Sequence, residues 1–357
     1  MMIKNSYTCI GVMSGTSLDG IDVAHIHFTL QNHRWEYRIH EAATIPYPQE
    51  WIELLKTAIS FSNEELKDLN EKYTEYLGQI ILHFIEKNNI NDIDAVCSHG
   101  HTILHQPQNG VTLQIGNLPH IAQIVNQKVI CDFRIADVLL GGQGAPLVPI
   151  GDRILFSEFD FCLNLGGFSN ISFEENGQRI AFDISPVNTV LNFYANQLGF
   201  DYDDKGSIAR SGTLNECVFE ELNALDYYKK KYPKSLGFEF VKELVLPLIE
   251  RHAIPTADKM HTFIEHVAYQ TSLALPQKEG QLLLTGGGTY NDFLIERMQL
   301  HLPNTALIIP DNKTLEYKEA LIFALLGVLK LRNEINVLRS VTGASKDHSA
   351  GIIYTPN

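Results

Sequence analysis

Residues 11–24 read GVMSGTSLDGIDVA. The apolar run Tyr7–Val12 predicts a strand that leads into this stretch, and Ile21–Phe28 predicts a second strand that leaves it. The loop between them exposes backbone N–H groups and hydroxyls, and its glycines permit a close approach to a ligand. Such an array suits a phosphate, and Asp19 or Asp22 can hold a magnesium ion directly or through water. Asp-Gly is also a common turn dipeptide, so an ordinary hairpin is the alternative.

The composition is typical of a globular soluble protein. The 357 residues can form two domains or one large domain, and 45% of them are hydrophobic while 20% are charged. The formal net charge of −14 disfavours nucleic acid and anionic membranes as partners. It does not exclude a phosphate site, because backbone amides and one magnesium ion act locally.

The ends and the cysteines of the chain indicate a cytoplasmic protein. The N-terminal residues lack the apolar segment of a signal peptide, and no apolar stretch approaches the length of a membrane span. The five cysteines are odd in number and widely spaced, and four lie in apolar strand-like runs. This pattern predicts buried reduced thiols rather than disulfides or a zinc site. They are Cys9, Cys97, Cys131, Cys162 and Cys217.

The second half of the chain begins as the first half does. Phe161–Leu165 predicts a strand, Gly166 and Gly167 predict a turn, and Ile171–Phe173 predicts the returning strand. A strand, a glycine turn and a strand therefore occur near the start of each half, which suggests two related halves with mixed α/β layers. A nucleotide would lie in a cleft between the halves, with its phosphates bound by one hairpin from each.

The remaining elements are expected as follows. Further strands are predicted at Trp35–Ala43, Ile93–Cys97, Val129–Phe133, Arg179–Ile184 and Gln281–Thr285. Helices are predicted after the capping box of Ser62 and Glu65, at Val187–Leu198, over Phe238–Leu275 with breaks at Pro247 and Pro255, and over Tyr317–Arg332. The breaker-rich segment Gly141–Pro149 places the domain boundary, so we expect one domain over residues 1–135, which residues 335–357 could join, and a second over 136–334.

Three polar segments could carry chemistry. Gly286–Gly288 follow a predicted strand and open a helix near Asn291, a weak signature of anion binding. Asp183 comes directly after a buried strand, where it could act as a general base or as a helix N-cap. His99, His101 and His105 could face one another, but no nearby cysteine or carboxylate completes a metal set, so we favour a hydrogen-bonding role.

Eight segments of the chain resemble, in order, the successive motifs of the anhydro-N-acetylmuramic acid kinases. The resemblance runs from about Ile10 to Tyr354, and the order and spacing of the motifs make it more specific than any one of them. The motifs are GVMSGTSLDGIDVA, SHGHTILHQP, DFRIADVLLGGQGAPLVP, NLGGFSNIS, AFDISPVN, PKSLG, LTGGGTYNDFL and SVTGA.

The resemblance implies a fold and an activity. The fold is the two-domain, actin-like ATPase (ribonuclease H-like) α/β fold with a nucleotide cleft between the domains. The activity is ATP-dependent opening and phosphorylation of 1,6-anhydro-N-acetylmuramic acid to N-acetylmuramate 6-phosphate, a step of peptidoglycan recycling, with ATP and Mg²⁺ as cofactors in a cytoplasmic homodimer. A kinase of another anhydro sugar such as levoglucosan, or of an ordinary hexosamine, is one alternative. A sugar-binding regulator without turnover is another.

The resemblance also assigns roles to individual residues. Asp183 matches the catalytic base, and Asp19 or Asp22 would supply the metal ligand. Glu319, Arg134 and His99 match sugar-side positions. The nucleotide-binding positions are Gly15, Thr16, Ser17, Leu18, Asp19, Gly20, Ile21 and Asp22 in the first loop and Gly286, Gly287 and Gly288 in the last.

The chain departs from the family pattern in three places. The family commonly reads DTGPGN where residues 183–188 read DISPVN, so Ser185 and Val187 stand at glycine positions. The family sequence VPAFH is here VPIGD, ending in Gly151 and Asp152, and the sequence PKSTGRE here has Phe238 in place of arginine. The first of these differences bears on how closely the backbone can approach a phosphate or a sugar.

Overall fold

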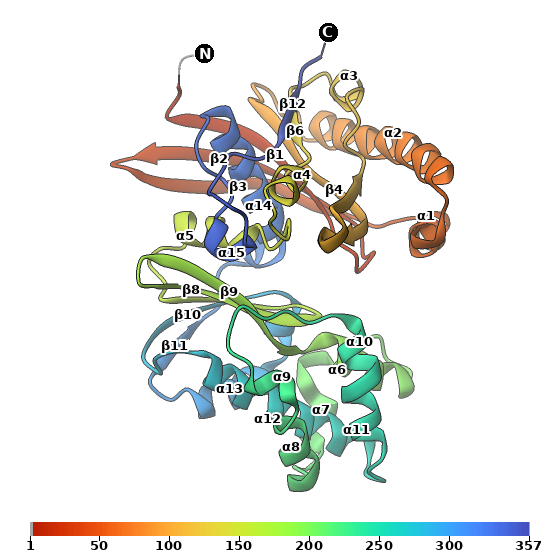
Figure 1. Cartoon of the computed structure of the whole chain (residues 1–357), viewed down its shortest axis with the longest axis vertical. Coiled ribbons are helices and arrows are strands. Elements are labelled where there is room, and N and C mark those ends of the chain that lie inside the picture. The colour runs from red at the N-terminus through yellow and green to blue at the C-terminus, as the bar shows by residue number, and fades with distance from the viewer. Residues whose placement is uncertain (1–2, 357) are drawn as a thin grey trace. The chain divides into compact units, whose positions relative to one another are not determined.

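The structure, a computed structural model, describes residues 3–356 and divides the chain into two compact units. Unit 1 comprises Met1–Leu155 and Tyr317–Asn357, and unit 2 comprises Phe156–Glu316 (Figure 1). These bounds differ from the boundaries expected at residues 135 and 334, because α5 (Val148–Leu155) and most of α14 (Asn312–Leu331) pack together in unit 1. A Cβ added at Gly151 of α5 would lie 2.5 Å from Cγ1 of Ile322 in α14.

Unit 1 is built on a seven-stranded mixed sheet. The strand order is β12-β6-β4-β1-β2-β3, and β5 pairs with β4 outside this path. β1, β2 and β3 are antiparallel neighbours, whereas β4 and β6 run parallel to β1. The strands are β1 (Ser6–Ser14), β2 (Ile21–Gln31), β3 (Arg34–Ile45), β4 (Ala95–Gln106), β5 (Val111–Ile115), β6 (Val129–Cys131) and β12 (Ile352–Tyr354).

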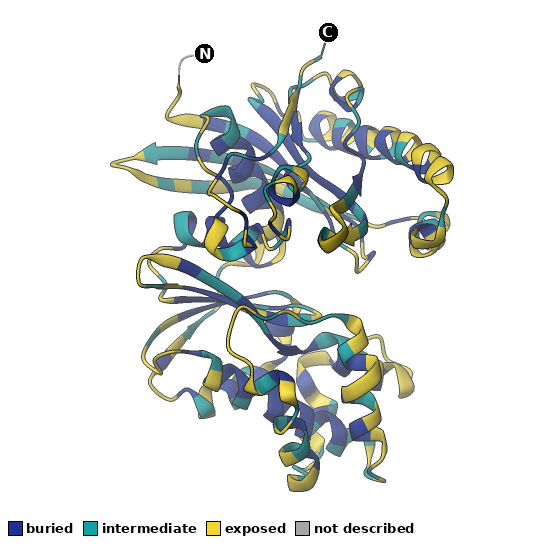
Figure 2. Cartoon of the chain, viewed as in Figure 1, coloured by how far each residue is buried: buried dark blue, intermediate teal, exposed yellow. Residues whose placement is uncertain are grey.

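Helices cover both faces of this sheet. Ile10 and Val12 of β1 join a core cluster with residues of α2 (Asn63–Lys87), while Gly11 of β1 faces α14. In Figure 2 the buried residues follow the strands and the helix faces turned toward them. The shorter helices of unit 1 are α1 (Gln49–Thr57), α3 (Ile121–Val125), α4 (Ile135–Leu139) and α15 (Arg339–Thr342).

Unit 2 has a five-stranded sheet with the order β11-β10-β7-β8-β9. Its strands are β7 (Phe161–Leu165), β8 (Phe168–Glu175), β9 (Gln178–Pro186), β10 (Gly280–Thr285) and β11 (Thr305–Ile308). Leu163, Leu165, Leu282 and Leu284 of the sheet enter one core with residues of the helices. The helices are α6 (Asn188–Gln197), α7 (Ser207–Ser211), α8 (Glu216–Asn223), α9 (Asp226–Lys229), α10 (Phe238–Phe240), α11 (Leu246–Glu250), α12 (Thr256–Ala274) and α13 (Asp292–His301).

The two units share one strand arrangement. In each, three antiparallel strands that follow one another in sequence are joined, on the side of the first strand, by two parallel strands. The first three strands are β1–β3 in unit 1 and β7–β9 in unit 2. The prediction of a two-domain α/β protein with related halves is therefore confirmed.

Local sequence signals account for most element ends. Ser62 and Glu65 form both hydrogen bonds of a capping box at the start of α2. The segment Ser98–Thr102, expected to follow a short strand, instead lies inside β4, where Gly100 adopts a φ of +75°.

All five cysteines are free thiols, and only Cys217 is exposed. Among the described residues, no helix is both long enough and apolar enough to cross a membrane.

The contact of α14 with the sheet yields a stability prediction. A Cβ added at Gly327 of α14 would lie 2.1 Å from Sγ of Cys97 in β4. We expect Gly327→Ala to lower the free energy of unfolding by about 1–3 kcal/mol, the usual effect of overpacking. Chemical denaturation measures this change. In a Cys97→Ala background, where the clashing sulfur is absent, the substitution should cost clearly less, and an equal cost in both backgrounds would contradict the packing described.

Candidate active site

The loop between β1 and β2 presents polar groups to solvent. Thr16, Ser17 and Asp19 are exposed, while Gly20 is buried beside β3. A Cβ at Gly20 would lie 2.6 Å from the carbonyl oxygen of Ile45, so a side chain cannot be accommodated there. Leu18 takes a left-handed φ of +62°, which turns the loop tightly. The loop therefore carries exposed hydroxyl-bearing residues above a closely packed base at Gly20.

A buried network of neutral hydroxyls anchors the start of this loop. Ser14, the last residue of β1, lies 2.7 Å from Nδ1 of His101 and 2.6 Å from the hydroxyl of Tyr47. Tyr73 of α2 donates to Ser14 at 3.2 Å. Burial lowers the pKa of His101 to about 4 and raises the pKa of Tyr47 to about 12. All four groups are thus uncharged at neutral pH, and they tie the loop to β4 and α2.

The two acidic residues proposed as metal ligands lie in different settings. Asp19 is at the exposed tip of the loop. Asp22 lies in β2, partly buried, where its Oδ1 accepts a hydrogen bond of 2.6 Å from the hydroxyl of Thr44 in β3. Both present carboxylate oxygens, the ligands that Mg²⁺ prefers.

His99 and Arg134 form a direct pair in unit 1. Nε of Arg134 donates to Nε2 of His99 at 2.9 Å, so Nδ1 of His99 carries the proton and donates to the carbonyl of Gly100 at 2.9 Å. Burial and the Arg134 charge hold the pKa of His99 well below its usual value, which keeps the imidazole neutral. A second guanidinium nitrogen, Nη1, donates to the carbonyl of Gly144 at 2.7 Å.

Glu319 on α14 is electrostatically coupled to this pair. The residue as a whole is exposed, but desolvation of its carboxyl group by the surrounding protein raises the pKa of that group. Asp22 acts in the same direction, whereas Arg134 and Lys318 lower the pKa. Lys318 is itself buried in an ion pair with Asp152 of α5, at 2.8 Å. Unit 1 thus brings together Asp22, His99, Arg134 and Glu319, which the sequence assigned to the site separately.

Asp183 in unit 2 is held by backbone groups on both sides. It lies inside β9 and not after a strand as the sequence predicted, because β9 continues to Pro186. Its N–H donates to the carbonyl of Lys234 at 3.1 Å and its carbonyl accepts from the Tyr227 hydroxyl. Its Oδ2 accepts from the N–H of Leu236 at 2.8 Å. Burial raises the pKa of Asp183, and the Leu236 hydrogen bond opposes that effect. Oδ1 has no hydrogen-bond partner within residues 3–356.

The residues at the two altered glycine positions point into unit 2. Ser185 is fully buried and its carbonyl accepts from the Ser169 hydroxyl at 3.1 Å. Val187 is fully buried in the core cluster and has a φ of −134°. Neither position needs the positive φ that only glycine adopts readily, so both side chains are accommodated without altering the exposed backbone.

The glycine run after β10 is packed on one side and open on the other. Gly286 has a φ of +84°, and a Cβ there would lie 2.6 Å from Oδ1 of Asn164. Gly288 is packed against Leu165, but a Cβ at Gly287 would meet nothing closer than 3.7 Å. Asn291 then caps α13, because its side chain accepts from the N–H of Leu294. Backbone groups of this loop can therefore approach a ligand at Gly287.

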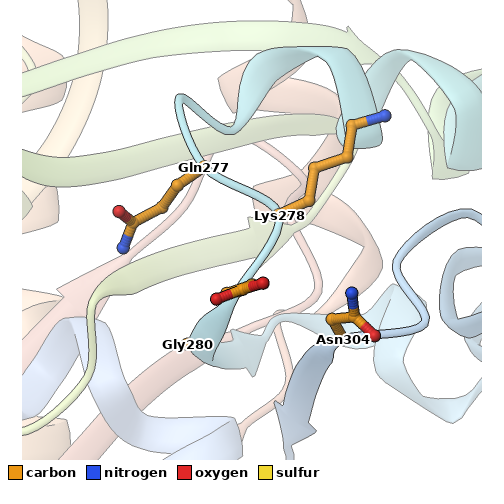
Figure 3. A pocket seen from close by; sticks show the side chains of 5 residues that line it. Gln277, Lys278, Gly280 and Asn304 are labelled. Carbon is orange, nitrogen blue, oxygen red and sulfur yellow. The ribbon is translucent and has the colours of Figure 1, made fainter.

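Some contributors to the site escaped the sequence reasoning. Tyr227, Lys234 and Leu236 surround Asp183, and Lys234 also lies 4.6 Å from the ring centre of Tyr227. The PKSLG motif at residues 233–237 was the only signal for Lys234 and Leu236, and no motif pointed to Tyr227. An open pocket at the start of β10 contains none of the predicted site residues (Figure 3). Its lining is Gln277, Lys278, Glu279, Gly280 and Asn304.

Comparison with known proteins places the chain in a family. The family model described as "Anhydro-N-acetylmuramic acid kinase" matches residues 7–356. The chain belongs to the anhydro-N-acetylmuramic acid kinase family. A relative of that name from Aliivibrio fischeri is 33% identical over 367 residues, covering 98% of this chain and 99% of its own length. Another from Bacillus thuringiensis subsp. konkukian is 34% identical over 379 residues, covering 97% and 99%.

Solved structures align with the chain only distantly. The (R)-2-hydroxyglutaryl-CoA dehydratase component A from Acidaminococcus fermentans aligns with a TM-score of 0.45 at 14% identity, covering 91% of this chain and 99% of its own. A xylulose kinase from Rhodospirillum rubrum aligns with a TM-score of 0.39 at 11% identity, covering 98% and 94%. The assignment to the family rests on the sequence match and not on these structures.

The neutral His101 makes stability depend on pH. An unfolded histidine titrates near pH 6.5, whereas burial lowers the pKa of His101 to about 4. As the pH falls from 6.5 to 4, the unfolded chain therefore binds a proton that the folded chain does not, and stability is lost. At pH 5 the loss from this residue is about 2 kcal/mol. Denaturation of His101→Gln should show a shallower decline between pH 7 and 5, whereas the exposed control His33→Gln should follow the parent protein.

Proposed function

We propose that this protein is an ATP-dependent kinase that opens and phosphorylates 1,6-anhydro-N-acetylmuramic acid, giving N-acetylmuramate 6-phosphate for peptidoglycan recycling. The observation that carries the proposal is the family match over residues 7–356. The setting of Asp183 supports it, because a partly buried carboxylate with one free oxygen is what the reaction requires. The names of the relatives support the same substrate.

In the proposed reaction each bond that forms is matched by a bond that breaks, and the proton released by water has an acceptor. A water oxygen bonds to the anomeric carbon, the bond between that carbon and the bridging oxygen breaks, and the oxygen stays on C6. This oxygen takes the γ-phosphoryl group of ATP, and ADP leaves. The proton of the attacking water must go to a base, and a positioned base contributes about 10²- to 10⁴-fold to the rate.

Asp183 suits the role of that base. The Leu236 N–H fixes Oδ2, so the carboxylate has one orientation and Oδ1 is left to accept a proton. Burial raises the pKa of Asp183, which makes the carboxylate a stronger base than a solvated aspartate. The alternative role of an N-cap receives no support, because the residue preceding α6 is Val187 and not Asp183.

We assign ATP to the two glycine loops. The first loop offers the exposed residues Thr16 and Ser17, whose hydroxyls suit a phosphate, and the second offers the open backbone at Gly287. Asp19 and Asp22 are carboxylates that fit Mg²⁺, with Asp22 already oriented by Thr44. A bound Mg²⁺ would neutralise charge on the phosphates.

We assign the sugar to His99, Arg134 and Glu319. Arg134 offers guanidinium N–H groups beyond the two that His99 and Gly144 engage, and Glu319, an exposed residue, offers a carboxylate. Ring hydroxyls and the lactyl carboxylate of the sugar are suitable partners for such groups.

The resemblance also implies a homodimer in the cytoplasm. Sedimentation velocity tests the dimer, and a monomer at all concentrations would contradict it.

The product of the reaction tests the proposed function. Incubation with ATP, magnesium and 1,6-anhydro-N-acetylmuramic acid should give a sugar that has gained one phosphate and one water, as measured by mass spectrometry. A phosphorylated sugar that keeps its bridge would contradict the coupled mechanism. Turnover of levoglucosan alone would assign the enzyme to a different anhydro sugar, and no turnover of any sugar would favour the regulator.

Replacement of Asp183 tests the assignment of the base. We expect Asp183→Asn to lower kcat by at least about a hundredfold, roughly 3 kcal/mol in barrier, with little change in the affinities for ATP and sugar. In the parent protein the rate should fall as the pH drops through the raised pKa of Asp183, because the protonated carboxyl group cannot act as a base.

Asp203 provides the matched control. Its carboxylate accepts from the N–H groups of Ile208 and Ala209 in the same unit. Asp203→Asn should lower the melting temperature while leaving kcat per folded molecule nearly unchanged. If Asp183→Asn behaves as Asp203→Asn does, Asp183 has a structural role and is not the base.

A further inference from the structure

The motif SVTGA at residues 340–344 has no role in the chemistry above. Its first three residues end the short helix α15, and Gly343 follows with a left-handed φ of +79°. The segment lies along the loop that follows α4: the N–H of Gln143 donates to the carbonyl of Thr342 at 2.8 Å, and the N–H of Ser345 donates to the carbonyl of Leu140 at 3.0 Å. The motif therefore holds a loop that is about 200 residues away in sequence.

Asp137 of α4 is the centre of this contact. Its side chain is fully buried. Oδ1 accepts from the hydroxyl of Thr342 at 2.7 Å, and Oδ2 accepts from the N–H of Gly144 at 2.7 Å. A Cβ at Gly142 would lie 2.1 Å from Oδ2, so the loop can close around the carboxylate only with glycine at that position. A buried carboxylate needs such partners, because leaving it unpaired is costly.

Gly144 connects Asp137 to Arg134. The N–H of Gly144 donates to Asp137, and its carbonyl accepts from Nη1 of Arg134 at 2.7 Å. Nε of Arg134 donates to His99, so the guanidinium group is fixed at two of its three nitrogens. Nη2 has no hydrogen-bond partner within residues 3–356 and remains available to a ligand. Moving Gly144 would release one of the two fixed nitrogens.

We propose that Thr342 and Asp137 are positioning residues that set the Arg134 guanidinium group for the acceptor sugar. The chain of contacts runs from the Thr342 hydroxyl through the Asp137 carboxylate and the Gly144 peptide to Nη1 of Arg134. The inference rests on the proposed function, because it takes Arg134 as a sugar-binding residue. It gives the C-terminal motif a function in substrate recognition.

Thr342→Val tests the proposal, because valine keeps the shape of threonine and removes the hydroxyl. We expect kcat/KM for the sugar to fall about tenfold, mainly through KM, while KM for ATP stays within twofold of the parent value. Thr342→Ser retains the hydroxyl and should restore most of the loss. Hydrogen exchange of the Gly144 amide should become faster in the valine variant and return toward the parent rate in the serine variant.

Thr305 in unit 2 supplies a matched control. It is a buried threonine whose hydroxyl has no hydrogen-bond partner within the described residues. Thr305→Val makes the same chemical change away from the proposed contact chain, and it should leave both KM values unchanged.

A double-mutant cycle separates positioning from a general loss of structure. If Thr342 acts through Arg134, then Thr342→Val should have less than a twofold effect on kcat/KM in an Arg134→Ala background. A tenfold effect in both backgrounds would overturn the proposal. So would a valine variant with a lower melting temperature and unchanged kinetics for the sugar. A parent protein that does not turn over the sugar would overturn the proposed function instead, and the inference with it.

Discussion

The position of the unit 1 site depends on the close contact between Gly11 of β1 and Ala320 of α14. A Cβ at Gly11 would lie 2.1 Å from the Ala320 carbonyl oxygen, so the helix backbone rests directly on the central strand. The neighbouring residue Glu319 is thereby fixed relative to β1, which also leads into the loop that we assign to ATP. Gly327, two turns further along α14, repeats the contact against Cys97 of β4. Gly11 and Cys97 are register partners on β1 and β4, so the two contacts seat α14 across these neighbouring strands and position its carboxylate, Glu319, relative to them.

In unit 2 hydrogen bonds, rather than close packing, fix the position of the carboxylate of Asp183. Within residues 3–356 the side chain of Asp183 has no ion-pair partner; its main-chain and side-chain atoms are held by hydrogen bonds to Lys234, Leu236 and Tyr227. Neutral donors orient a carboxylate without adding a positive charge that would lower its basicity strongly. The pKa of Asp183 therefore stays raised by burial. In unit 1 desolvation likewise raises the pKa of Glu319, but there a charged neighbour, Arg134, opposes the rise.

The sequence predicted most of the helices and strands because these depend on short-range patterns, whereas the site positions came from the family resemblance and stay predictions. The paired strand–glycine turn–strand units and the capping box at Ser62 are read from neighbouring residues. The sequence did not predict the contacts of His101 with Ser14, 87 residues apart, or of Thr342 with Asp137, 205 residues apart. Such pairs become neighbours only when the sheet has formed and the C-terminal segment has returned to it. The unit boundaries also depend on a long-range contact, that of α5 with α14.

That long-range contact explains the chain's departure from the family sequence VPAFH. Gly151 stands where the family sequence has phenylalanine, and a Cβ at Gly151 would lie 2.5 Å from Cγ1 of Ile322, so this packing leaves no room for a side chain there. The next residue, Asp152, is an acid buried against Lys318 at 2.8 Å. An acid buried here without a cation would be destabilising, so Asp152 and Lys318 depend on each other. Lys318 also lowers the pKa of Glu319. Asp152 of the altered motif therefore pairs with Lys318, the residue that precedes the carboxylate we assign to the sugar.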